Sequence, residues 1–368
     1  MEVKNSFSGI YKNKTVLVTG NNGFKGSWLC LWLKELGANV IGFAPENSNK
    51  ESLCNRLNLN LTQITGDIRN KEMVIEAVST YKPEIVFHLA AQPIVTRSYK
   101  DPSGTFETNV LGTVNILEAV RLSPSVTACV NITTDKVYKN KELSQNGYKE
   151  TDELGGHDPY SASKACSELV TESYRKSFFS SNDTALIASA RAGNVIGGGD
   201  WAEDRLIPDI FRALYKNEKI KLRNPDSIRP WQHVLEPLSG YLLLGAKLLS
   251  KEKEFASAWN FGPDEGSTVR VEDIILAIQK HWKELAYYVE SSAKIVHETN
   301  MLSLDCTKAK KQLQWMPVWD IHKTIEKTTK WYMDFFKTKY NSVDLQKRCM
   351  DDLTAYVNDF KSMNALWA

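Results

Sequence analysis

A glycine-rich turn lies near the amino terminus, between a run typical of a buried strand and a run typical of a helix. Thr15–Thr19 (TVLVT) is apolar or β-branched throughout, and Trp28–Leu36 carries apolar residues at helical spacing. Between them stands the string Gly20-Asn21-Asn22-Gly23-Phe24-Lys25-Gly26. Glycines at such a turn let the backbone approach a pyrophosphate, while the helix amino terminus supplies N–H donors. Glycines also serve ordinary turns, but this placement between the first strand and the first helix predicts a dinucleotide-binding loop.

The alternation of strand and helix patterns continues through the first half of the chain. Strand signals occur at Asn39–Phe43, Glu84–His88 and Ala128–Thr133, with helical patterns around Met73–Val78 and Thr113–Val120. Strands that alternate with helices and read as apolar runs form parallel sheets buried on both faces. Because the connections in such units are right-handed, we expect an α/β fold with a doubly wound parallel sheet of the Rossmann type.

The pattern changes after about Arg191, where glycine, proline and tryptophan cluster up to Trp231. We therefore expect a cofactor-binding domain over residues 1–190, a smaller interleaved substrate lobe over 191–337, and a helical tail over 338–368. Ala256–Phe261 has a strand pattern and is a candidate to return to the first domain. The tail is polar and amphipathic, and its simplest interpretation is a solvated helix packed on the body.

Composition excludes several other classes of protein. Of the 368 residues, 42% are hydrophobic and 24% charged, which is enough apolar material for a full core. A net charge of +2 without a basic stripe argues against a nucleic-acid partner. No apolar run is long enough to span a bilayer and the amino terminus lacks a signal-peptide core, so we expect a cytoplasmic protein without membrane association. The six cysteines lack metal-ligand spacing, so we expect reduced structural thiols and no metal site.

A second motif predicts acid–base chemistry. Tyr160 and Lys164 form a YxxxK pair introduced by Asp158-Pro159. Four residues apart on a helix, the two side chains share one face. A lysine ammonium beside a tyrosine favours the phenolate and lowers the pKa of the tyrosine toward neutrality. Such a tyrosine can take the proton of a hydroxyl group as hydride leaves its carbon. A surface pair of this spacing also arises by chance, but with the glycine turn upstream the motif predicts catalysis.

Together, the GxxGxxG spacing and the YxxxK pair resemble the extended short-chain dehydrogenase/reductase superfamily. Gly66-Asp67-Ile68-Arg69, which follows a further strand pattern between Asn39–Phe43 and Glu84–His88, agrees with it, as does His88-Leu89-Ala90-Ala91-Gln92 at the end of Glu84–His88. The resemblance implies NAD as the cofactor, with Asp67 at the adenine, although Asp67 has an alternative interpretation as the cap of the next helix. The second strand ends in Phe43-Ala44-Pro45-Glu46, without the usual ribose-binding aspartate, so Glu46 is the candidate for that role. The lack of a nearby arginine favours NAD over NADP. The implied cofactor-binding residues are Gly20, Asn22, Gly23, Phe24, Lys25, Gly26, Asp67, Ile68, Leu89, Ala90, Ala91, Gln92, Asn109, Thr133, Tyr160 and Lys164.

The end of the strand pattern at Ala128–Thr133 narrows the resemblance to the sugar-nucleotide 4,6-dehydratases. Members that only oxidise, reduce or epimerise carry small or neutral residues where Asp135 and Lys136 stand, whereas dehydratases carry Thr-Asp-Glu. Thr134-Asp135-Lys136 departs from that pattern and resembles the branch that acts on CDP-glucose. The resemblance implies that Tyr160 and Lys164 drive the hydride steps and that Thr134 positions the sugar. It further implies that Asp135 protonates the C6 oxygen and Lys136 removes the C5 proton. The alternative is a solvated ion pair at a strand end.

Two tryptophan-bearing strings, Gly197-Gly198-Gly199-Asp200-Trp201 and Ser227–Val234 (SIRPWQHV), resemble the same branch. Arginine forks match diphosphate oxygens, whereas tryptophans serve a core as readily as a ligand, and His233 has an alternative interpretation as a structural histidine. The substrate-binding residues that the resemblance implies are Gln92, Thr134, Asn194, Trp201, Arg205, Ile207, Arg223, Arg229 and His233.

We therefore expect conversion of CDP-glucose to CDP-4-keto-6-deoxyglucose, a step toward the deoxysugars of surface polysaccharides such as lipopolysaccharide O-antigen. Three alternatives remain: a 4,6-dehydratase of a GDP- or dTDP-linked sugar, a nucleotide-sugar C4 epimerase, and a cofactor-binding regulatory protein. Asp135 and Lys136 argue against the epimerase, and the intact Tyr160 and Lys164 argue against the regulatory protein. The resemblance also implies a homodimer or homotetramer, formed through the helices after the fourth and fifth strands.

Overall fold

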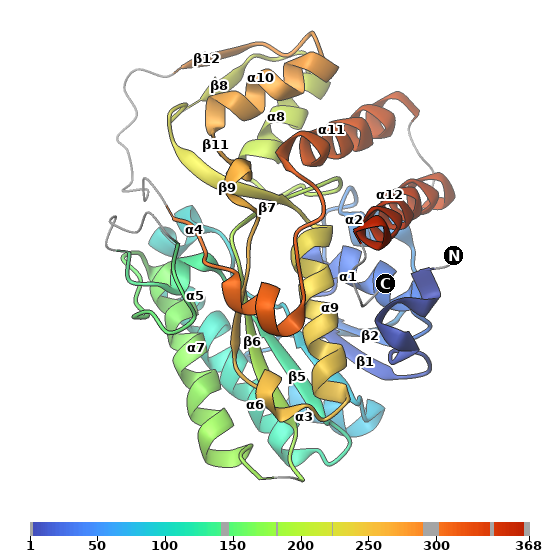
Figure 1. Ribbon diagram of the computed structural model, residues 1–368, viewed down its shortest axis with the longest axis vertical. Helices are drawn as coiled ribbons and strands as arrows, with labels where there is room; N and C mark the ends of the chain where they lie inside the picture. The colour runs from blue at the N-terminus through green and yellow to red at the C-terminus, as the bar shows by residue number, and fades with distance from the viewer. Residues whose placement is uncertain are drawn as a thin grey trace.

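The computed structural model describes residues 3–140, 147–181, 183–222, 224–289, 302–338 and 342–363. Its centre is a seven-stranded parallel sheet with the strand order β10-β6-β5-β4-β1-β2-β3. Figure 1 shows this sheet in the lower half of the molecule, with helices on both sides and a smaller lobe above it. The strand order reverses between β1 and β4, as in a doubly wound sheet, so the predicted fold class is confirmed.

Four of the seven strands of the main sheet agree closely with the predicted patterns. They are β1 (Thr15–Thr19), β2 (Asn39–Ala44), β3 (Thr62–Thr65), β4 (Ile85–His88), β5 (Ala128–Ile132), β6 (Leu186–Ala192) and β10 (Ala258–Phe261). The patterns predicted for β1, β2, β4 and β5 match to within one residue at each end, whereas β6 had not been predicted. β10 pairs in parallel with β6, with Ala258 opposite Ser189, so the chain returns to the main sheet after it has entered the second lobe.

Alternate side chains of the inner strands enter two different cores. Val16 and Val18 of β1 join the larger core beneath α1 (Phe24–Glu35) and α9 (Leu235–Leu249). Leu17 joins the smaller core on the opposite face. That face is covered by α3 (Lys71–Tyr81), α6 (Gly112–Leu122) and α7 (Pro159–Phe178). Because both faces are covered, the strands are continuous apolar runs. The helical patterns predicted around residues 28–36, 73–78 and 113–120 lie in α1, α3 and α6.

The second lobe contains two small sheets packed with helices. The strands are β7 (Asn194–Ile196), β8 (Ile220–Leu222), β9 (Ile228–His233), β11 (Thr268–Arg270) and β12 (Tyr287–Val289). They form a three-stranded sheet in the order β11-β9-β7 and a two-stranded sheet of β12 and β8. The helices are α8 (Leu206–Tyr215), α10 (Val271–His281) and α11 (Ile321–Thr338). Phe211 of α8 stacks on Tyr332 of α11 with ring centroids 4.1 Å apart, at the centre of an aromatic core.

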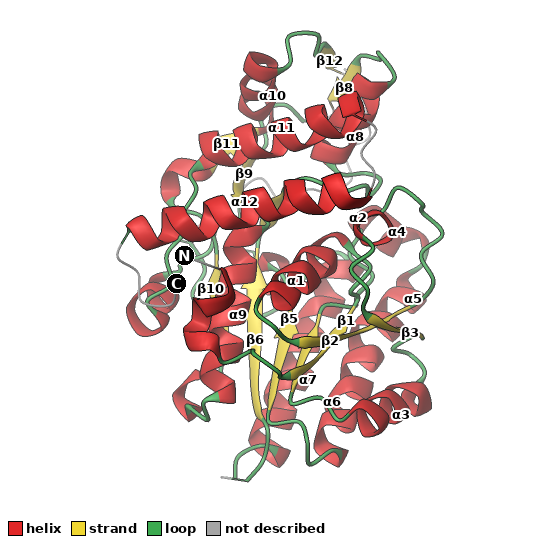
Figure 2. Cartoon of the chain, turned by 90° about the vertical axis from the view of Figure 1, so that its right-hand side faces the viewer, coloured by secondary structure: helices red, strands yellow, loops and turns green. Residues whose placement is uncertain are grey.

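The last helix, α12 (Ser342–Ser362), crosses the molecule between α11 and α1, as Figure 2 shows. It packs against α11, α2 and the amino-terminal segment η1. Six of its side chains are buried in the larger core: Leu345, Cys349, Leu353, Tyr356, Val357 and Phe360. The sequence pattern predicted a solvated helix packed on the body; α12 does pack on the body, and its packed face is an integral part of the core.

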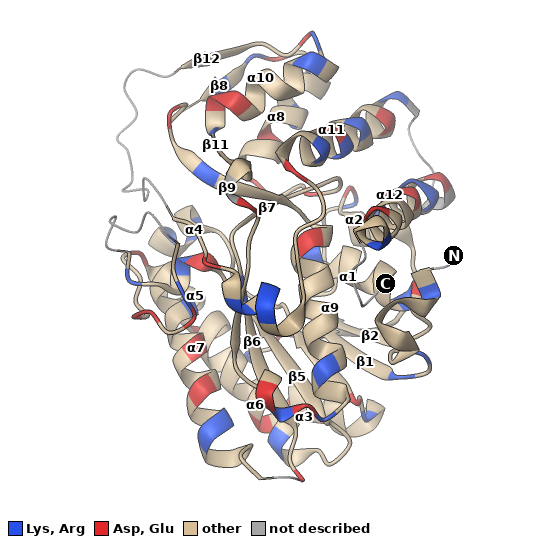
Figure 3. Cartoon of the chain, in the orientation of Figure 1, with Lys and Arg blue, Asp and Glu red and all other residues tan. Residues whose placement is uncertain are grey.

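Short elements complete the described chain: η1 (Val3–Gly9), α2 (Leu53–Leu57), α4 (Val95–Lys100), α5 (Pro102–Phe106), η2 (Glu107–Leu111), η3 (Asp135–Val137), η4 (Lys253–Phe255), η5 (Glu265–Ser267) and η6 (Ala309–Leu313). All six cysteines are free thiols. Within the described residues, no helix is long and apolar enough to cross a membrane, and no cluster of metal-ligating side chains occurs. Figure 3 shows basic and acidic residues interspersed along the surface helices.

Candidate functional site

A cleft of about 1520 Å³ opens at the carboxyl ends of β1, β4, β5 and β6. Its lining comes from the glycine turn, the strand ends and the first turns of α7, and from β7, α8 and β9 of the second lobe. Ligands of open α/β sheets bind at this edge, where the strand order reverses. The position of the cleft therefore marks it as the candidate site.

The glycine turn leaves no room for side chains at two of its positions. Gly20 has a φ of +69°, and a Cβ there would lie 2.8 Å from the Cα of Ala90. A Cβ on Gly26 would lie 2.1 Å from the carbonyl oxygen of Gly20. Gly23 caps α1 without a side-chain acceptor for its first turn, so the N–H groups there are available to an anion. A bare backbone loop at a helix amino terminus fits the pyrophosphate of a dinucleotide cofactor.

The cleft continues from the glycine turn past the ends of β2 and β3, where Ala44, Pro45, Asp67 and Ile68 line it. Glu46, the sequence candidate for the ribose, is exposed and lies outside this lining. Asn22, which does line the cleft, donates from its amide to the carbonyl oxygen of Pro45 at 2.7 Å.

Asp67 faces the cleft and does not cap the following helix. Its carboxylate accepts from the guanidinium of Arg69 at 2.6 Å and from the backbone N–H of Arg69 at 2.9 Å. The hydrogen bond to Arg69 holds the pKa of Asp67 below its usual value. Asn70 caps α3 instead, because its side chain accepts from the N–H of Met73. The interpretation of Asp67 as the helix cap is therefore wrong.

The segment after β4 forms the floor of the cleft. Leu89, Ala90, Ala91 and Gln92 line it as the sequence predicted, but Asn109 of η2 does not. Asn109 is buried behind Gln92, whose backbone N–H donates to its side-chain oxygen at 2.8 Å. Its amide donates to the hydroxyl of Ser163 at 2.9 Å. The prediction of Asn109 as a cofactor contact is thus corrected, since Asn109 ties the floor of the cleft to α7.

The end of β5 brings an acid and a base into the cleft. Thr134 donates to the carboxylate of Asp135 at 2.8 Å, and the ammonium of Lys136 lies 3.8 Å from that carboxylate. The side chain of Asp135 is 3% exposed and that of Lys136 is 33% exposed. A Cβ on Gly193 would lie 3.0 Å from the second carboxylate oxygen of Asp135, so glycine keeps this approach open. A solvated surface pair does not describe Asp135, because its carboxylate is buried.

Tyr160 and Lys164 both line the cleft from the first turns of α7. The helix begins at Pro159, and Asp158 caps it by accepting from the N–H of Ser161 at 2.9 Å. Burial raises the pKa of Tyr160 to about 12, and a hydrogen bond with Thr134 opposes the rise. Burial also lowers the pKa of Lys164 to about 8.

The YxxxK motif predicted a lowered pKa for Tyr160, whereas in this structure the pKa of Tyr160 is raised. The ammonium of Lys164 donates to the carbonyl oxygen of Ile132 at 2.9 Å. Burial of the Tyr160 hydroxyl has the larger effect on its pKa.

Lys25 extends from the glycine turn into the same cleft. Its ammonium lies 5.9 Å from the centroid of the Tyr241 ring. Burial, and then the positive charge of Arg205, lower the pKa of Lys25 to about 7. Lys25, Lys164 and Arg205 together give the cleft a concentration of cationic groups, which suits a ligand that carries phosphates.

Four of the predicted substrate contacts line the cleft from the second lobe: Asn194, Arg205, Ile207 and Arg229. The guanidinium of Arg205 lies 3.1 Å from the carboxylate of Asp200, which is itself almost fully buried. Asp200 holds Arg205 at the rim while leaving other guanidinium donors toward the cleft.

Two predicted substrate contacts lie outside the cleft lining, and a third cannot be placed. Trp201 packs against Tyr332 and Phe335 of α11, with ring centroids 5.4 and 5.2 Å away, so it belongs to the aromatic core of the lobe. His233 is buried 4.8 Å from the ring of Trp319, and burial lowers its pKa to about 3. His233 is thus a neutral structural residue. Arg223 lies outside the described residues.

Other residues line the cleft without having been predicted there. Trp231, which the sequence left open between core and ligand, lines the cleft although only 7% of it is exposed. Asp158 and Asp200 also line it. The position of Asp158 directly before a proline is a helix-cap signature, whereas nothing in the local sequence around Asp200 indicates its ion pair with Arg205.

Comparisons with known proteins agree with this geometry. The family model described as GDP-mannose 4,6 dehydratase matches residues 17–328. CDP-glucose 4,6-dehydratase of Salmonella typhimurium is 44% identical over 351 residues, which cover 94% of this chain and 98% of that protein. The structure of dTDP-glucose 4,6-dehydratase from Bacillus anthracis in complex with NAD has a TM-score of 0.73 at 21% identity and covers 90% of this chain and 99% of its own. The structure of UDP-glucose 4-epimerase from Thermus thermophilus in complex with NAD has a TM-score of 0.76 at 24% identity, covering 87% and 99%.

Proposed function

Because this chain belongs to the GDP-mannose 4,6-dehydratase family, we propose that it is an NAD-dependent lyase that converts CDP-glucose to CDP-4-keto-6-deoxyglucose and water. The observation that carries the proposal is the meeting of Asp135 and Lys136 with Tyr160 and Lys164 in one cleft beside the glycine turn. Dehydration needs an acid and a base in addition to the tyrosine, and a C4 epimerase does not. CDP-glucose as the substrate is supported by the 44% identity to the Salmonella enzyme over nearly the whole chain.

The residues that would hold NAD are those of the glycine turn, together with Asp67, Ile68, Leu89, Ala90, Ala91, Gln92, Thr133, Tyr160 and Lys164. When bound, NAD supplies the redox chemistry, accepting hydride from C4 of the sugar and returning it to C6, so that the reaction has no net redox change. The first turn of α1 offers its N–H groups to the pyrophosphate, and Ala44 with Pro45 borders the adenosine end of the cleft.

Tyr160 is the base for the sugar 4-hydroxyl. Its phenol hydrogen-bonds with Thr134, and both that bond and the charge of Arg205 favour the phenolate. Asp135 and Asp158 oppose it. The proton of the 4-hydroxyl passes to the oxygen of Tyr160 as the C4–H bond breaks, and Thr134 orients both groups.

Asp135 and Lys136 carry out the elimination. The C4 ketone acidifies the C5 hydrogen, and the amine of Lys136 takes that proton. Asp135 gives a proton to the C6 oxygen, the C6–O bond breaks, and one water leaves. Lys136 then returns its proton to C5, while the C4 oxygen remains a ketone. The proton that Tyr160 took from the 4-hydroxyl is released to solvent, and Asp135 takes up one proton to replace the one that left in water, so the protons balance. The buried position of Asp135 shields its carboxyl from bulk water.

The second lobe holds the nucleotide diphosphate. Arg205 and Arg229 present guanidinium groups to the cleft, and Asn194 presents an amide. Guanidinium forks match diphosphate oxygens. Asn22 and Gln92 line the same cleft from the first domain.

Isotope tracing tests the proposal. Purified protein with NAD is incubated separately with CDP-, dTDP- and UDP-glucose and with GDP-mannose, each with deuterium at C4. Loss of one water from CDP-glucose alone, with the deuterium now on C6, is the expected result. In D₂O the product also gains one deuterium at C5. Dehydration of another nucleotide sugar would keep the chemistry but reject the substrate, and isomerisation without loss of water would indicate an epimerase.

Matched variants separate the stages. Asp135→Asn and Lys136→Met keep the size of the side chains and leave Tyr160 intact, so single-turnover oxidation at C4 remains while product formation falls by about 100-fold or more. Tyr160→Phe is expected to lose both the oxidation at C4 and the formation of product. Loss of all activity in Lys136→Met, with oxidation also abolished, would contradict the division of roles.

We also propose a homo-oligomer in the cytoplasm. Large apolar side chains are exposed on the neighbouring elements η2, α6 and α7, with Leu111, Leu122 and Leu169 each more than half exposed. Exposed apolar side chains on adjacent helices are typical of a subunit interface. Light scattering of the purified protein, compared with a Leu111→Lys/Leu169→Lys variant, tests the assembly. Placement in a pathway to deoxysugars of surface polysaccharide follows from the product, which is a 6-deoxy nucleotide sugar.

A further inference from the structure

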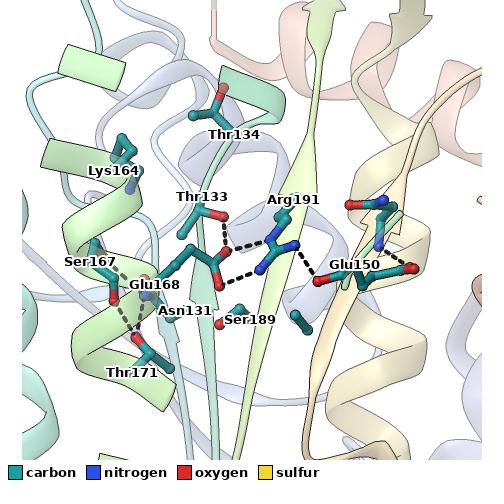
Figure 4. Close-up of polar contacts among 12 residues, drawn as sticks. Asn131, Thr133, Thr134, Glu150, Lys164, Ser167, Glu168, Thr171, Ser189 and Arg191 are labelled. Atoms are coloured by element: carbon teal, nitrogen blue, oxygen red, sulfur yellow. Dashed lines mark hydrogen bonds and ion pairs between the residues drawn. The ribbon is translucent and has the colours of Figure 1, made fainter. Parts of the chain in front are cut away.

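A buried ion pair lies one helical turn below the catalytic pair of α7. Glu168 of α7 and Arg191 of β6 are 3% and 4% exposed. The guanidinium donates to both carboxylate oxygens, at 2.9 and 3.0 Å, as Figure 4 shows. Burying such a pair costs about as much free energy as the attraction returns, so the pair is weak evidence for a stabilising role. Its position suggests a different role.

The remaining polar atoms of the pair are also satisfied. Thr133 donates its hydroxyl proton to Glu168 at 2.5 Å. Arg191 donates to the hydroxyl of Tyr138 at 2.7 Å and to the carbonyl oxygen of Glu150 at 3.2 Å. The pair therefore joins α7 and β6 to the end of β5, and its geometry is fixed from several sides.

Lys164 and Glu168 form hydrogen bonds with two successive residues at the end of β5. The ammonium of Lys164 donates to the carbonyl oxygen of Ile132, and the carboxylate of Glu168 accepts from the hydroxyl of Thr133. Lys164 and Glu168 are four residues apart on α7 and thus share one face. The segment held in this way leads directly into Thr134, and so into the acid and base of the elimination.

Charges around Lys164 give Glu168 a second effect. Burial lowers the pKa of Lys164, and the negative charge of Glu168 opposes that change. Lys25 faces Lys164 from α1 with a like charge, and His88 faces it from β4 as a neutral ring, because burial lowers the pKa of His88 to about 3. Without ligands, burial favours the neutral phenol of Tyr160 on the same helix, whereas the base for the sugar hydroxyl is the phenolate that Thr134 and Arg205 favour. Glu168 thus supplies the negative charge that Lys164 senses among the described groups around it.

Arg191 keeps Glu168 ionised. Burial raises the pKa of Glu168, but the charge and hydrogen bonds of Arg191, with the hydrogen bond from Thr133, bring it below the usual value. The carboxylate is therefore a fixed negative charge throughout the neutral pH range.

We propose that Glu168 and Arg191 are positioning residues of this site: they lock the end of β5 against α7 and keep Lys164 in its charged ammonium form. The consequence for catalysis rests on the proposed function, whereas the effect on Lys164 does not. YxxxK in this chain is thus the upper part of a longer unit, Tyr160-x₃-Lys164-x₃-Glu168, with Arg191 as its counter-ion.

The test is a double variant, Glu168→Gln/Arg191→Gln, which removes both charges and keeps a hydrogen-bonded pair of amides. Single Glu168→Gln leaves the buried guanidinium without a counter-ion and is expected to be much less stable, so the double variant is the decisive protein. Lysine labelled with ¹³C at Cε reports the protonation of Lys164 by NMR in the protein without ligands, and the Lys164→Arg spectrum assigns the signal. We expect the titration midpoint to fall from about 8 in the wild type by about one to two pH units, the size expected for a charge one helical turn away.

The second measurement is the pH profile of kcat for dehydration. The alkaline limb moves to lower pH in the double variant by the same amount as the NMR midpoint. The single variant Arg191→Lys keeps a cation beside Glu168. We therefore expect the titration midpoint of Lys164 in this variant to stay close to the wild-type value. Thr171→Val is the matched control on the same helix: it removes buried hydrogen bonds with Asn131 and Ser167 but no charge, and leaves midpoint and profile unchanged.

An NMR midpoint that stays at the wild-type value in the double variant would overturn the proposal, whatever happens to the rate. So would a shifted midpoint with an unshifted activity profile, because the reaction would then not use the charge of Lys164. If the wild type dehydrates no nucleotide sugar, the proposed function fails, and the NMR titration still decides the role of Glu168.

Discussion

Glu236, at the start of α9, offers a quantitative test of how the carboxyl-terminal helix is joined to the body. Its buried carboxylate accepts from the backbone N–H groups of Trp319 at 2.7 Å and of Val318 at 3.0 Å. It also accepts from the hydroxyl of Tyr356 of α12 at 2.8 Å. One carboxylate therefore links α9, the segment before α11, and α12. The perturbation is Glu236→Gln.

The magnitude follows from the pKa of this group. Burial raises the pKa of Glu236 to about 7, although its three donors oppose the rise. The folded protein thus holds this proton more tightly than the unfolded chain, whose glutamate titrates near 4.3. Between these two pH values the folded state binds more protons, so the free energy of unfolding falls as the pH rises. The total loss is about 4 kcal/mol, at about 1.4 kcal/mol per pH unit.

The glutamine variant does not ionise, so it lacks this slope. The NH₂ group of the glutamine would face groups that donate to Glu236 in the wild type. We therefore expect this mismatch to lower the free energy of unfolding by about 1–3 kcal/mol, independently of pH. Urea unfolding followed by tryptophan fluorescence, between about pH 4.5 and pH 8, gives the difference between wild type and variant. That difference shrinks by about 3 kcal/mol as the pH rises through this range and is constant above about pH 7.

Glu252→Gln is the matched control, because Glu252 pairs with Lys247 at 3.1 Å but is one-third exposed. It leaves the pH slope of the wild type intact. A wild-type-minus-Glu236→Gln difference that is the same at both ends of the pH range would refute the reasoning, and would mean that the three donors keep Glu236 ionised at no cost.

Three further predictions follow from contacts in the structure. Gly26→Ala places a Cβ 2.1 Å from the carbonyl oxygen of Gly20, so we expect the affinity for NAD in a calorimetric titration to fall by about 100-fold or more. The control Gly266→Ala, with nothing within 4 Å of its Cβ, leaves the affinity for NAD unchanged. Tyr138→Phe removes a hydroxyl that donates to Asn260 and accepts from Arg191, both at 2.7 Å, and we expect chemical denaturation to show a loss of about 1–3 kcal/mol with an unchanged pH profile of activity. A chain ended before Ser342 loses the buried face of α12, where each large apolar side chain contributes about 1.5–3 kcal/mol to the free energy of unfolding. We therefore expect gel filtration to show little soluble protein. A monodisperse, active truncated protein would contradict this.

The sequence predicted the main sheet well because its strands are buried on both faces. In β1 every residue after Thr15 is buried, and in β5 every residue is buried, so the boundaries of the strands coincide closely with those of the buried runs. The glycine turn was predictable for a related reason. Gly20 and Gly26 have no room for a side chain, and a steric requirement of this kind is visible in the residue type itself.

Contacts made across the fold were harder to predict. Asn109 has the polarity of a ligand contact, but it is used between two backbone groups of Gln92 and the hydroxyl of Ser163. The direction of the pKa of Tyr160 depends on burial of its hydroxyl, which the YxxxK spacing does not report. His233 lies beside Trp28 and Trp319, and the latter is distant in sequence. These outcomes are set by tertiary packing, so no local pattern contains them.

The triple glycine before Asp200 shows how a string can identify a branch of a family without touching the ligand. Gly198 lies against the ring of Trp331, and a Cβ there would come within 2.0 Å of it. The carbonyl oxygen of Gly198 accepts from the indole N–H of Trp28 at 2.9 Å, on the helix that follows the cofactor turn.

Gly197, one residue earlier, lies beside the ring of Phe24 in the same turn, since a Cβ there would lie 3.3 Å from that ring. The string therefore couples the cofactor turn to α11 and fixes where Asp200, and with it Arg205, stands at the rim of the cleft. We accordingly expect Gly198→Ala to raise the KM for the nucleotide sugar through a displaced Arg205, as seen in steady-state kinetics, while Trp201→Phe, which changes only the aromatic core, lowers stability and leaves KM unchanged.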